Sequence, residues 1–204
     1  MRHARGWAFA AALLAAACAT SPFKSTWKAG EEKAVSLRGR TTAAVYLSDV
    51  EAVRRNAEQA MVEEIQARGG SGLAGYTVLD TEAASDRAHG FSLLRDRGAE
   101  FALVMRAASR ERDTLRVHPW FGGGLGGWGA RGSGWGWGWG VLYDPAYGYP
   151  ETVVTVEIRL YALAGERLLW AGVSQARLPS DWVGFLRGLA REALARMEAE
   201  GVLY

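Results

Sequence analysis

Few residues of this sequence have types and spacings that could do chemistry, and the first candidate is a glycine-rich run. Residues 70–75 read Gly-Ser-Gly-Leu-Ala-Gly, which fits the G-x-G-x-x-G pattern of dinucleotide-binding turns. That pattern binds pyrophosphate where a strand precedes it and a helix follows, so that the helix N-terminus meets the phosphates. Here the hydrophobic pattern predicts a helix before the run and a strand after it. We therefore interpret the run as a flexible loop and expect no nucleotide cofactor.

Two histidines and a pair of carboxylates are the other candidates for catalysis or metal binding. His89 and His118 could serve a metal site or a Ser-His-Asp triad, but neither belongs to a spaced pair such as H-E-x-x-H. Asp80 and Glu82 could flank a glycosidic bond, although only their proximity in the sequence supports that use. We therefore predict no catalytic residue, no metal site and no cofactor, and hence a protein that is not an enzyme.

Tryptophan alternates with glycine in one long segment that interrupts the regular patterns. Residues 119–150 hold 12 of the 26 glycines and five of the nine tryptophans, among them Trp135, Trp137 and Trp139. In an extended chain these three indoles would share one side, about 6.6 Å apart, and form an aromatic strip. Such a strip can contact a membrane, an envelope partner or a sugar. It can also fold over its own sheet or stay without order, because glycine makes ordering costly.

A series of arginines precedes this segment. Arg106, Arg110, Arg112 and Arg116 share one face of an extended chain and could bind an anionic lipid or glycan. The alternative is a solvated sheet face, and the balanced charge of the chain favours that interpretation.

The overall charge argues against a nucleic-acid partner. The chain has 204 residues and a net charge of +2, and the first 17 residues carry two of its arginines. The remainder therefore has as many basic as acidic side chains, whereas nucleic-acid binders gather a basic surplus on one face. Cys18 is the only cysteine, so neither a disulfide within the chain nor a thiolate metal cluster can form.

The N-terminus has the layout of a secretory signal. Arg2 and Arg5 precede an uncharged apolar run over residues 7–17, and three alanines then lead to Cys18. Residues 13–18, Leu-Leu-Ala-Ala-Ala-Cys, resemble the lipobox of bacterial lipoproteins, although Ala15 stands where that motif has leucine. The resemblance implies that Cys18 is lipidated, for example with palmitate, and becomes the new N-terminus. Ala19 follows where lipoproteins kept in the inner membrane often have aspartate, which favours the outer membrane.

Hydrophobic periodicity predicts an α/β domain over residues 41–204, after a signal peptide over 1–17 and a lipidated tether over 18–40. We expect a strand at 42–50, a helix from Glu51 to the glycines at 69–70 and a short strand at 76–79. A second helix, which Ser85 or Asp86 can cap, is expected to end at Gly98. Ser48 and Glu51 could form a capping box. On the first helix, Arg54, Glu58 and Glu63 are expected to face outward.

The second half begins with a strand at 101–105 that is apolar on both faces. After the insertion at 119–150 come a strand from residue 152, a turn at 164–166 and a strand at 168–177. A final helix begins after Ser180 or Asp181 and ends at Gly201. The order β-α-β-α-β, insertion, β-β-α predicts a mixed sheet of about five strands with three helices, as α/β or alternatively α+β.

Two stretches resemble known envelope proteins. Gly98-Ala99-Glu100 running into the apolar strand at 101–105, and Leu168-Leu169-Trp170 followed by the last helix, are similar to a group of uncharacterised bacterial lipoproteins. The layout of 42–118 and 151–203 also looks like the N-terminal domain of the periplasmic propeller protein of the Tol–Pal system. The resemblance implies a small envelope α/β domain, and it carries no catalytic residue over.

These observations favour a lipid-anchored envelope lipoprotein that faces the periplasm and acts as a non-enzymatic binding or assembly module. Its expected partners are the membrane, through the lipid on Cys18, and an envelope protein or peptidoglycan. The alternative is an envelope hydrolase or carbohydrate-binding protein that uses the tryptophan-rich loop. A cleft holding His118 near two carboxylates would favour the enzyme, and a flat closed surface would favour the binding module.

Overall fold

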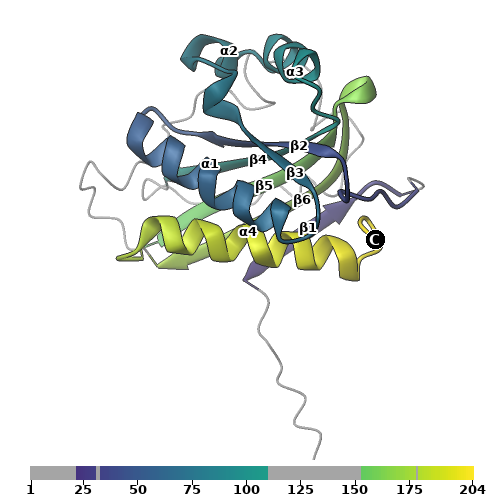
Figure 1. Cartoon of the computed structure of the whole chain (residues 1–204). Coiled ribbons are helices and arrows are strands. Elements are labelled where there is room, and N and C mark those ends of the chain that lie inside the picture. The colour runs from purple at the N-terminus through teal and green to yellow at the C-terminus, as the bar shows by residue number, and fades with distance from the viewer. Residues whose placement is uncertain (1–21, 31–32, 110–152, 178) are drawn as a thin grey trace, which may run out of the picture.

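The computed structural model describes residues 22–30, 33–109, 153–177 and 179–204, which form one mixed sheet with helices on both faces (Figure 1). The strands are β1 (Phe23–Lys28), β2 (Thr41–Leu47), β3 (Ser71–Ala74), β4 (Phe101–Ser109), β5 (Val153–Ala162) and β6 (Arg167–Arg177). The helices are α1 (Glu51–Gln66), α2 (Thr81–Ser85), α3 (Arg87–Asp96) and α4 (Trp182–Ala199), with short 3-10 turns at Gly75–Thr77 and Ala164–Glu166. The predicted α/β class with a mixed sheet is confirmed.

The sheet has six strands in the order β1-β6-β5-β4-β2-β3. β2 lies parallel to both β3 and β4, as expected for two β-α-β crossovers. β4, β5, β6 and β1 then pair antiparallel. The sheet has one strand more than expected because β1 joins it, and α2 is a short additional helix before α3.

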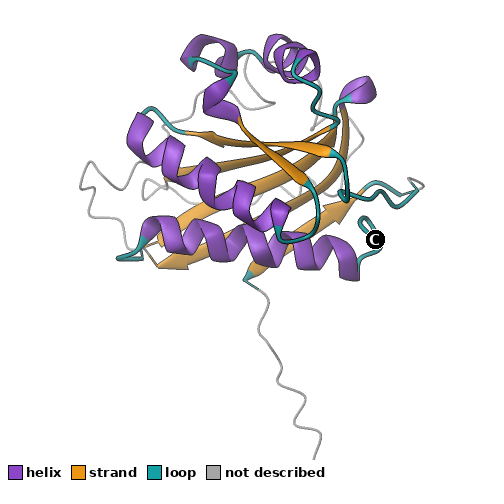
Figure 2. Cartoon of the chain, viewed as in Figure 1, coloured by secondary structure: helices purple, strands orange, loops and turns teal. Residues whose placement is uncertain are grey.

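Helices lie on both faces of the sheet (Figure 2), and an apolar cluster lies between the sheet and the helices on each face. α1 and α4 cover one face, where Leu103, Ile158 and Leu160 are fully buried. α2 and α3 cover part of the other face, over Val45, Val104 and Tyr161. The predicted alternation in β5 and the two-sided burial of β4 are confirmed, because each strand lies between two neighbours beneath helices.

The range 18–40, expected to be a tether leading into the domain, contains β1, which pairs with β6 at the edge of the sheet. Its Phe23 packs edge-to-face on the buried Trp170, with ring centroids 5.4 Å apart. Glu200, after α4, accepts hydrogen bonds from Thr26 Oγ1 at 2.9 Å and from Trp170 Nε1 at 2.8 Å. Lys28 Nζ donates to the Glu200 carbonyl at 2.7 Å. These contacts hold β1 as an edge strand.

β3 lies earlier in the chain than predicted, at residues 71–74, and Tyr76 belongs to a 3-10 turn. The glycine-rich run is therefore a strand rather than a flexible loop. A Cβ on Gly72 would lie 2.7 Å from Val62 Cγ1 of α1, so glycine allows the strand and the helix to approach closely.

The ends of the helices follow the predicted signals at α3 and α4 but not at α1. Asp86 and Asp181 accept hydrogen bonds from the first turns of α3 and α4, and Gly98 and Gly201 follow their ends. The capping box at α1 was wrong, because Val50 is the N-cap and contributes no side-chain hydrogen bond. Ser48 Oγ accepts from the Val50 N–H, and Glu51 instead pairs with Arg55 at 2.6 Å.

Candidate functional site

The predicted catalytic candidates do not form a reactive constellation in the described part of the chain. His89 is exposed on α3, Asp80 caps α2 through the Ala83 N–H at 2.8 Å, and Glu82 is exposed on α2. Across the described residues, no group of three or more histidine, cysteine, aspartate or glutamate side chains is placed to hold a metal ion. Asp80 therefore has a local structural role.

Several predicted residues lie outside the described residues. They are the lipidation candidate Cys18, the candidate binding residues Trp135, Trp137 and Trp139, the insertion at 119–150, His118, and Arg110, Arg112 and Arg116. The described residues nevertheless fix where these segments join the sheet.

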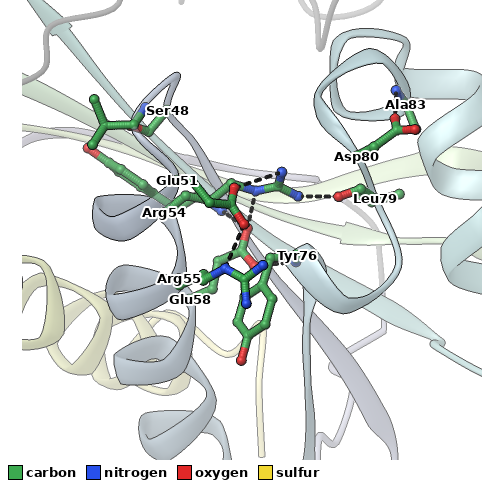
Figure 3. Close-up of polar contacts among 11 residues, drawn as sticks. Ser48, Glu51, Arg54, Arg55, Glu58, Tyr76, Leu79, Asp80 and Ala83 are labelled. Carbon is green, nitrogen blue, oxygen red and sulfur yellow. Dashed lines mark hydrogen bonds and ion pairs between the residues drawn. The ribbon is translucent and has the colours of Figure 1, made fainter.

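A buried polar network lies at the end of β2, where the sequence predicted two outward-facing charges (Figure 3). Arg54 and Glu58 of α1 are 5% and 0% exposed, and Arg54 Nε donates to Glu58 Oε1 at 3.2 Å. Glu58 also accepts from the backbone N–H groups of Tyr46 at 3.1 Å and Tyr76 at 2.5 Å. Arg54 Nη2 donates to the Leu79 carbonyl at 2.6 Å. The expectation for Arg54 and Glu58 was therefore wrong, whereas Glu63 is half exposed, as predicted.

The burial of Glu58 decides what this network can do. Burial raises the pKa of the Glu58 carboxyl, while the hydrogen bonds from Tyr46 and Tyr76 and the charge of Arg54 lower it. Because Glu58 is fully buried, it does not reach a ligand in solution. The network instead joins α1 to β2 and to the turn after β3, which makes it a structural element rather than a reactive one.

A second charged group lies on the sheet, where the arginine series begins. Glu157 lies between Arg159, at 3.0 Å, and Arg106, at 3.6 Å, and all three side chains are mostly buried. Burial lowers the pKa of the Arg106 guanidinium, Glu157 raises it and Arg159 lowers it further. The solvated-face interpretation is therefore wrong for Arg106, because its side chain is only 16% exposed and pairs with Glu157.

The strand pairing brings three chain segments to one end of the sheet. Phe23 opposes Ser174, which also opposes Val156 on its other side. Ser109, the last described residue before the insertion, opposes Val154, and Val153 follows the insertion and opposes Arg177. We call this end, marked by Phe23, Ser109, Val153 and Arg177, the insertion end. The segment that carries Cys18 therefore joins the sheet at the same end as the two residues that flank positions 110–152, the range that holds the tryptophan-rich segment.

The Arg54–Glu58 pair carried a signal that the sequence analysis missed. Arg54, Glu58, Met61 and Ile65 follow one another at spacings of four, three and four residues, which places them on one helix face. Met61 and Ile65 are fully buried, so the two charges belong to the core stripe. Among the described residues, no helix is both long and apolar enough to cross a membrane.

No protein-family model matches this sequence, and no curated protein matches it either. The fold is similar to a PelC dodecamer from Paraburkholderia phytofirmans in two crystal forms. One gives a TM-score of 0.44 at 12% identity over 86% of this chain and 98% of that chain. The other gives 0.45 at 11% identity over 88% of this chain and 96% of that chain.

A third solved structure is lipoprotein GNA1162 from Neisseria meningitidis. Its TM-score is 0.38 at 12% identity, over 79% of this chain and 99% of that chain. This neighbour is named as a lipoprotein, and none of the three structures is the Tol–Pal propeller protein. With identities of 12% or less and TM-scores of 0.45 or less, these likenesses identify neither a family nor a function.

Proposed function

We propose that this chain is an envelope lipoprotein, held to a membrane by acyl chains on Cys18, and that it acts as a non-enzymatic binding or assembly module. The lipobox-like run that ends at Cys18 carries the anchor, and the start of β1 at Phe23 limits how far the domain can lie from that anchor. Five residue steps separate Cys18 from Phe23, so their Cα atoms lie within about 17 Å of each other. A tether running from Cys18 to residue 40 would have allowed a separation of about 75 Å between the Cα atoms at its two ends.

A short linker gives the domain a preferred orientation. With Cys18 at the membrane surface, the insertion end of the sheet faces the lipid, because Phe23, Ser109 and Val153 lie together there. The two described residues that flank positions 110–152, Ser109 and Val153, then lie at the end of the sheet nearest the membrane. Tryptophan favours the boundary between lipid and water, so we assign Trp135, Trp137 and Trp139 to contact with that surface or with an envelope partner bound on it. Ala19 favours the outer membrane.

The lipid anchor is tested by replacing the acylated cysteine. We expect Cys18→Ser to abolish acylation and release the chain from membranes, because the remaining sequence has no other lipid attachment of this kind. Thr20→Ala, two residues away, is the matched control and should stay acylated. Intact-mass measurement and fractionation at high salt report both properties. An unmodified Cys18 in the membrane-extracted chain would contradict the proposal.

The aromatic contact is tested on the lipid-free Cys18→Ser chain, so that acyl chains do not mask it. Replacing Trp135, Trp137 and Trp139 by alanine should reduce sedimentation with vesicles while leaving the melting temperature within a few degrees. Trp128→Ala, in the same segment but outside the alternating run, is the control. Loss of binding to peptidoglycan instead of vesicles would identify the wall as the partner. A much lower melting temperature of the triple variant would show that the three indoles stabilise the folded domain instead.

A further inference from the structure

A pocket lies at the end of the sheet opposite the insertion end. Its volume is about 320 Å³, and the turn at residues 36–38, the end of α1 and the residues after α4 enclose it. α1 runs from the end of β2 back toward its beginning, so this pocket end faces away from Phe23. In the proposed orientation it opens away from the membrane, although the inference does not depend on the lipid.

Backbone pairing fixes the walls of the pocket. Val35 and Leu203 form an isolated parallel bridge, in which the Val35 N–H donates to the Val202 carbonyl at 2.9 Å. The Tyr204 N–H donates to the Val35 carbonyl at 3.2 Å. Leu37 and Leu203 are 4% and 5% exposed and supply the apolar part of the lining, and the Tyr204 ring is 81% exposed at its rim. The site is therefore preformed and partly apolar, as small-molecule sites usually are.

The two arginines of the pocket differ in what they already bind. Arg68 donates to Glu198 at 3.1 Å and to the carbonyls of Glu64 at 3.2 Å and Arg191 at 3.1 Å. The Arg38 guanidinium is exposed and has no hydrogen bond or ion pair with any described residue. Arg68 is thus occupied, and Arg38 is the cation available to a ligand.

Gly69 positions the stem of Arg38. Its φ is +78°, which favours glycine, and a Cβ there would lie 3.3 Å from Arg38 Cγ. The stem therefore packs directly against the Gly69 backbone, which holds the guanidinium at the pocket. Ser36 Oγ accepts from the Arg38 N–H at 3.2 Å, so its own hydroxyl proton remains available to donate.

We propose that this pocket binds a small amphipathic anion, with a carboxylate on Arg38 and Ser36 and an apolar body against Leu37, Leu203 and Tyr204. Guanidinium groups bind carboxylates through paired N–H donors, and the apolar wall adds affinity that a bare anion lacks. A volume of about 320 Å³ limits the ligand to a small molecule.

The test uses three probes on the purified full chain: phenylacetate, its uncharged analogue 2-phenylethanol, and acetate. We expect phenylacetate to shift the amide resonances of Leu37 and Leu203 saturably and to bind at least about fivefold more tightly than the other two. Arg38→Gln should weaken phenylacetate binding by at least about fivefold. Arg97→Gln, an exposed arginine outside the pocket, is the control and should bind as the unmodified chain does.

Each alternative outcome has a defined meaning. Absence of saturable shifts with all three probes overturns the site. If the Arg38→Gln chain binds phenylacetate as tightly as the unmodified chain does, the Arg38 guanidinium does not bind the carboxylate. If acetate binds as tightly as phenylacetate, the apolar wall does not contribute to affinity. Because none of these measurements uses acylation, failure of the pocket proposal is distinguishable from failure of the lipid anchor.

Discussion

Glu58 is the single side chain whose contribution to the fold is clearest. Its carboxylate accepts hydrogen bonds from backbone N–H groups of β2 and of the turn after β3, while Arg54 donates a hydrogen bond to the Leu79 carbonyl. Desolvating two charges is costly, and the hydrogen bonds to the backbone offset that cost. The pair therefore satisfies backbone groups at the ends of elements, where strand pairing has stopped.

Breaking this pair should be much more costly than breaking an exposed one. We expect Glu58→Gln to lower the free energy of unfolding by about 3–5 kcal/mol, because it removes the buried counter-charge of Arg54 and leaves only the half-exposed Glu51, 3.9 Å away. Glu63→Gln removes a half-exposed pair with Arg187, and it should cost less than about 1 kcal/mol. Denaturant unfolding measures both. Equal losses of unfolding free energy in the two variants would show that Glu58 is not the buried partner of Arg54.

Glu200 makes the docking of β1 dependent on pH. Burial by itself would raise its pKa, but hydrogen bonds from Arg196, Trp170 and Thr26 outweigh burial and lower the pKa below the ordinary value of 4.5. A lowered folded-state pKa means that the stabilisation is present above that ordinary value and is lost as the pH falls through the lowered one.

We therefore expect Glu200→Gln to cost about 1–3 kcal/mol at neutral pH, and the difference from the unmodified chain to shrink in acid. Glu192→Gln, exposed on α4, serves as the control. Urea unfolding at a series of pH values gives both curves. A difference that stays constant from neutral to acid pH would rule out the carboxylate as its source.

Elements with a long regular pattern were predictable, and those fixed by close packing were not. β5 alternates apolar and polar residues over its length, and β4 is apolar on both faces, so periodicity alone located them. β1 is short, and its place depends on Trp170 and Glu200, far away in the sequence. β3 contains Gly72, which lowers strand propensity but is required by the contact with Val62.

The packing of β3 on α1 predicts opposite effects for two glycine substitutions. Gly72→Ala places a Cβ 2.7 Å from Val62 Cγ1 and 3.1 Å from its Cα, and it should cost about 1–3 kcal/mol. Gly188→Ala lies in α4 with open space around it, and it should be neutral or stabilising by up to about 1 kcal/mol. Thermal unfolding compares the two. An unchanged melting temperature for Gly72→Ala would mean that this run is not packed against the helix.

The proposals assign a function to each of two opposite ends of the sheet, and sequence periodicity indicated neither end. The α/β class followed from the pattern, whereas the predicted insertion at 119–150 lies outside the described residues. That Phe23, Ser109 and Val153 meet at one end follows only from the strand order, which depends on pairing between distant segments. The pocket likewise requires residues 35–38 to meet residues 203–204.

The tryptophan-rich segment should be dispensable for folding. Ser109 already pairs with Val154, so a short connection can close β4 and β5 into a hairpin. We expect replacement of residues 121–148 by a short Gly/Ser linker to leave a domain that melts cooperatively within a few degrees of the original. Calorimetry tests this. A broad or absent transition would show that the segment is part of the core.

The orientation of the domain on the membrane is the central claim, and quenching by labelled lipids tests it most directly. A fluorophore is attached through Arg177→Cys at the insertion end or through Arg97→Cys, which precedes β4 at the opposite end, in the acylated chain on vesicles containing spin-labelled lipids. Strong quenching at position 177 with little at position 97 is the predicted result. Equal quenching at both positions, or stronger quenching at position 97, would contradict an anchor that holds the insertion end against the membrane.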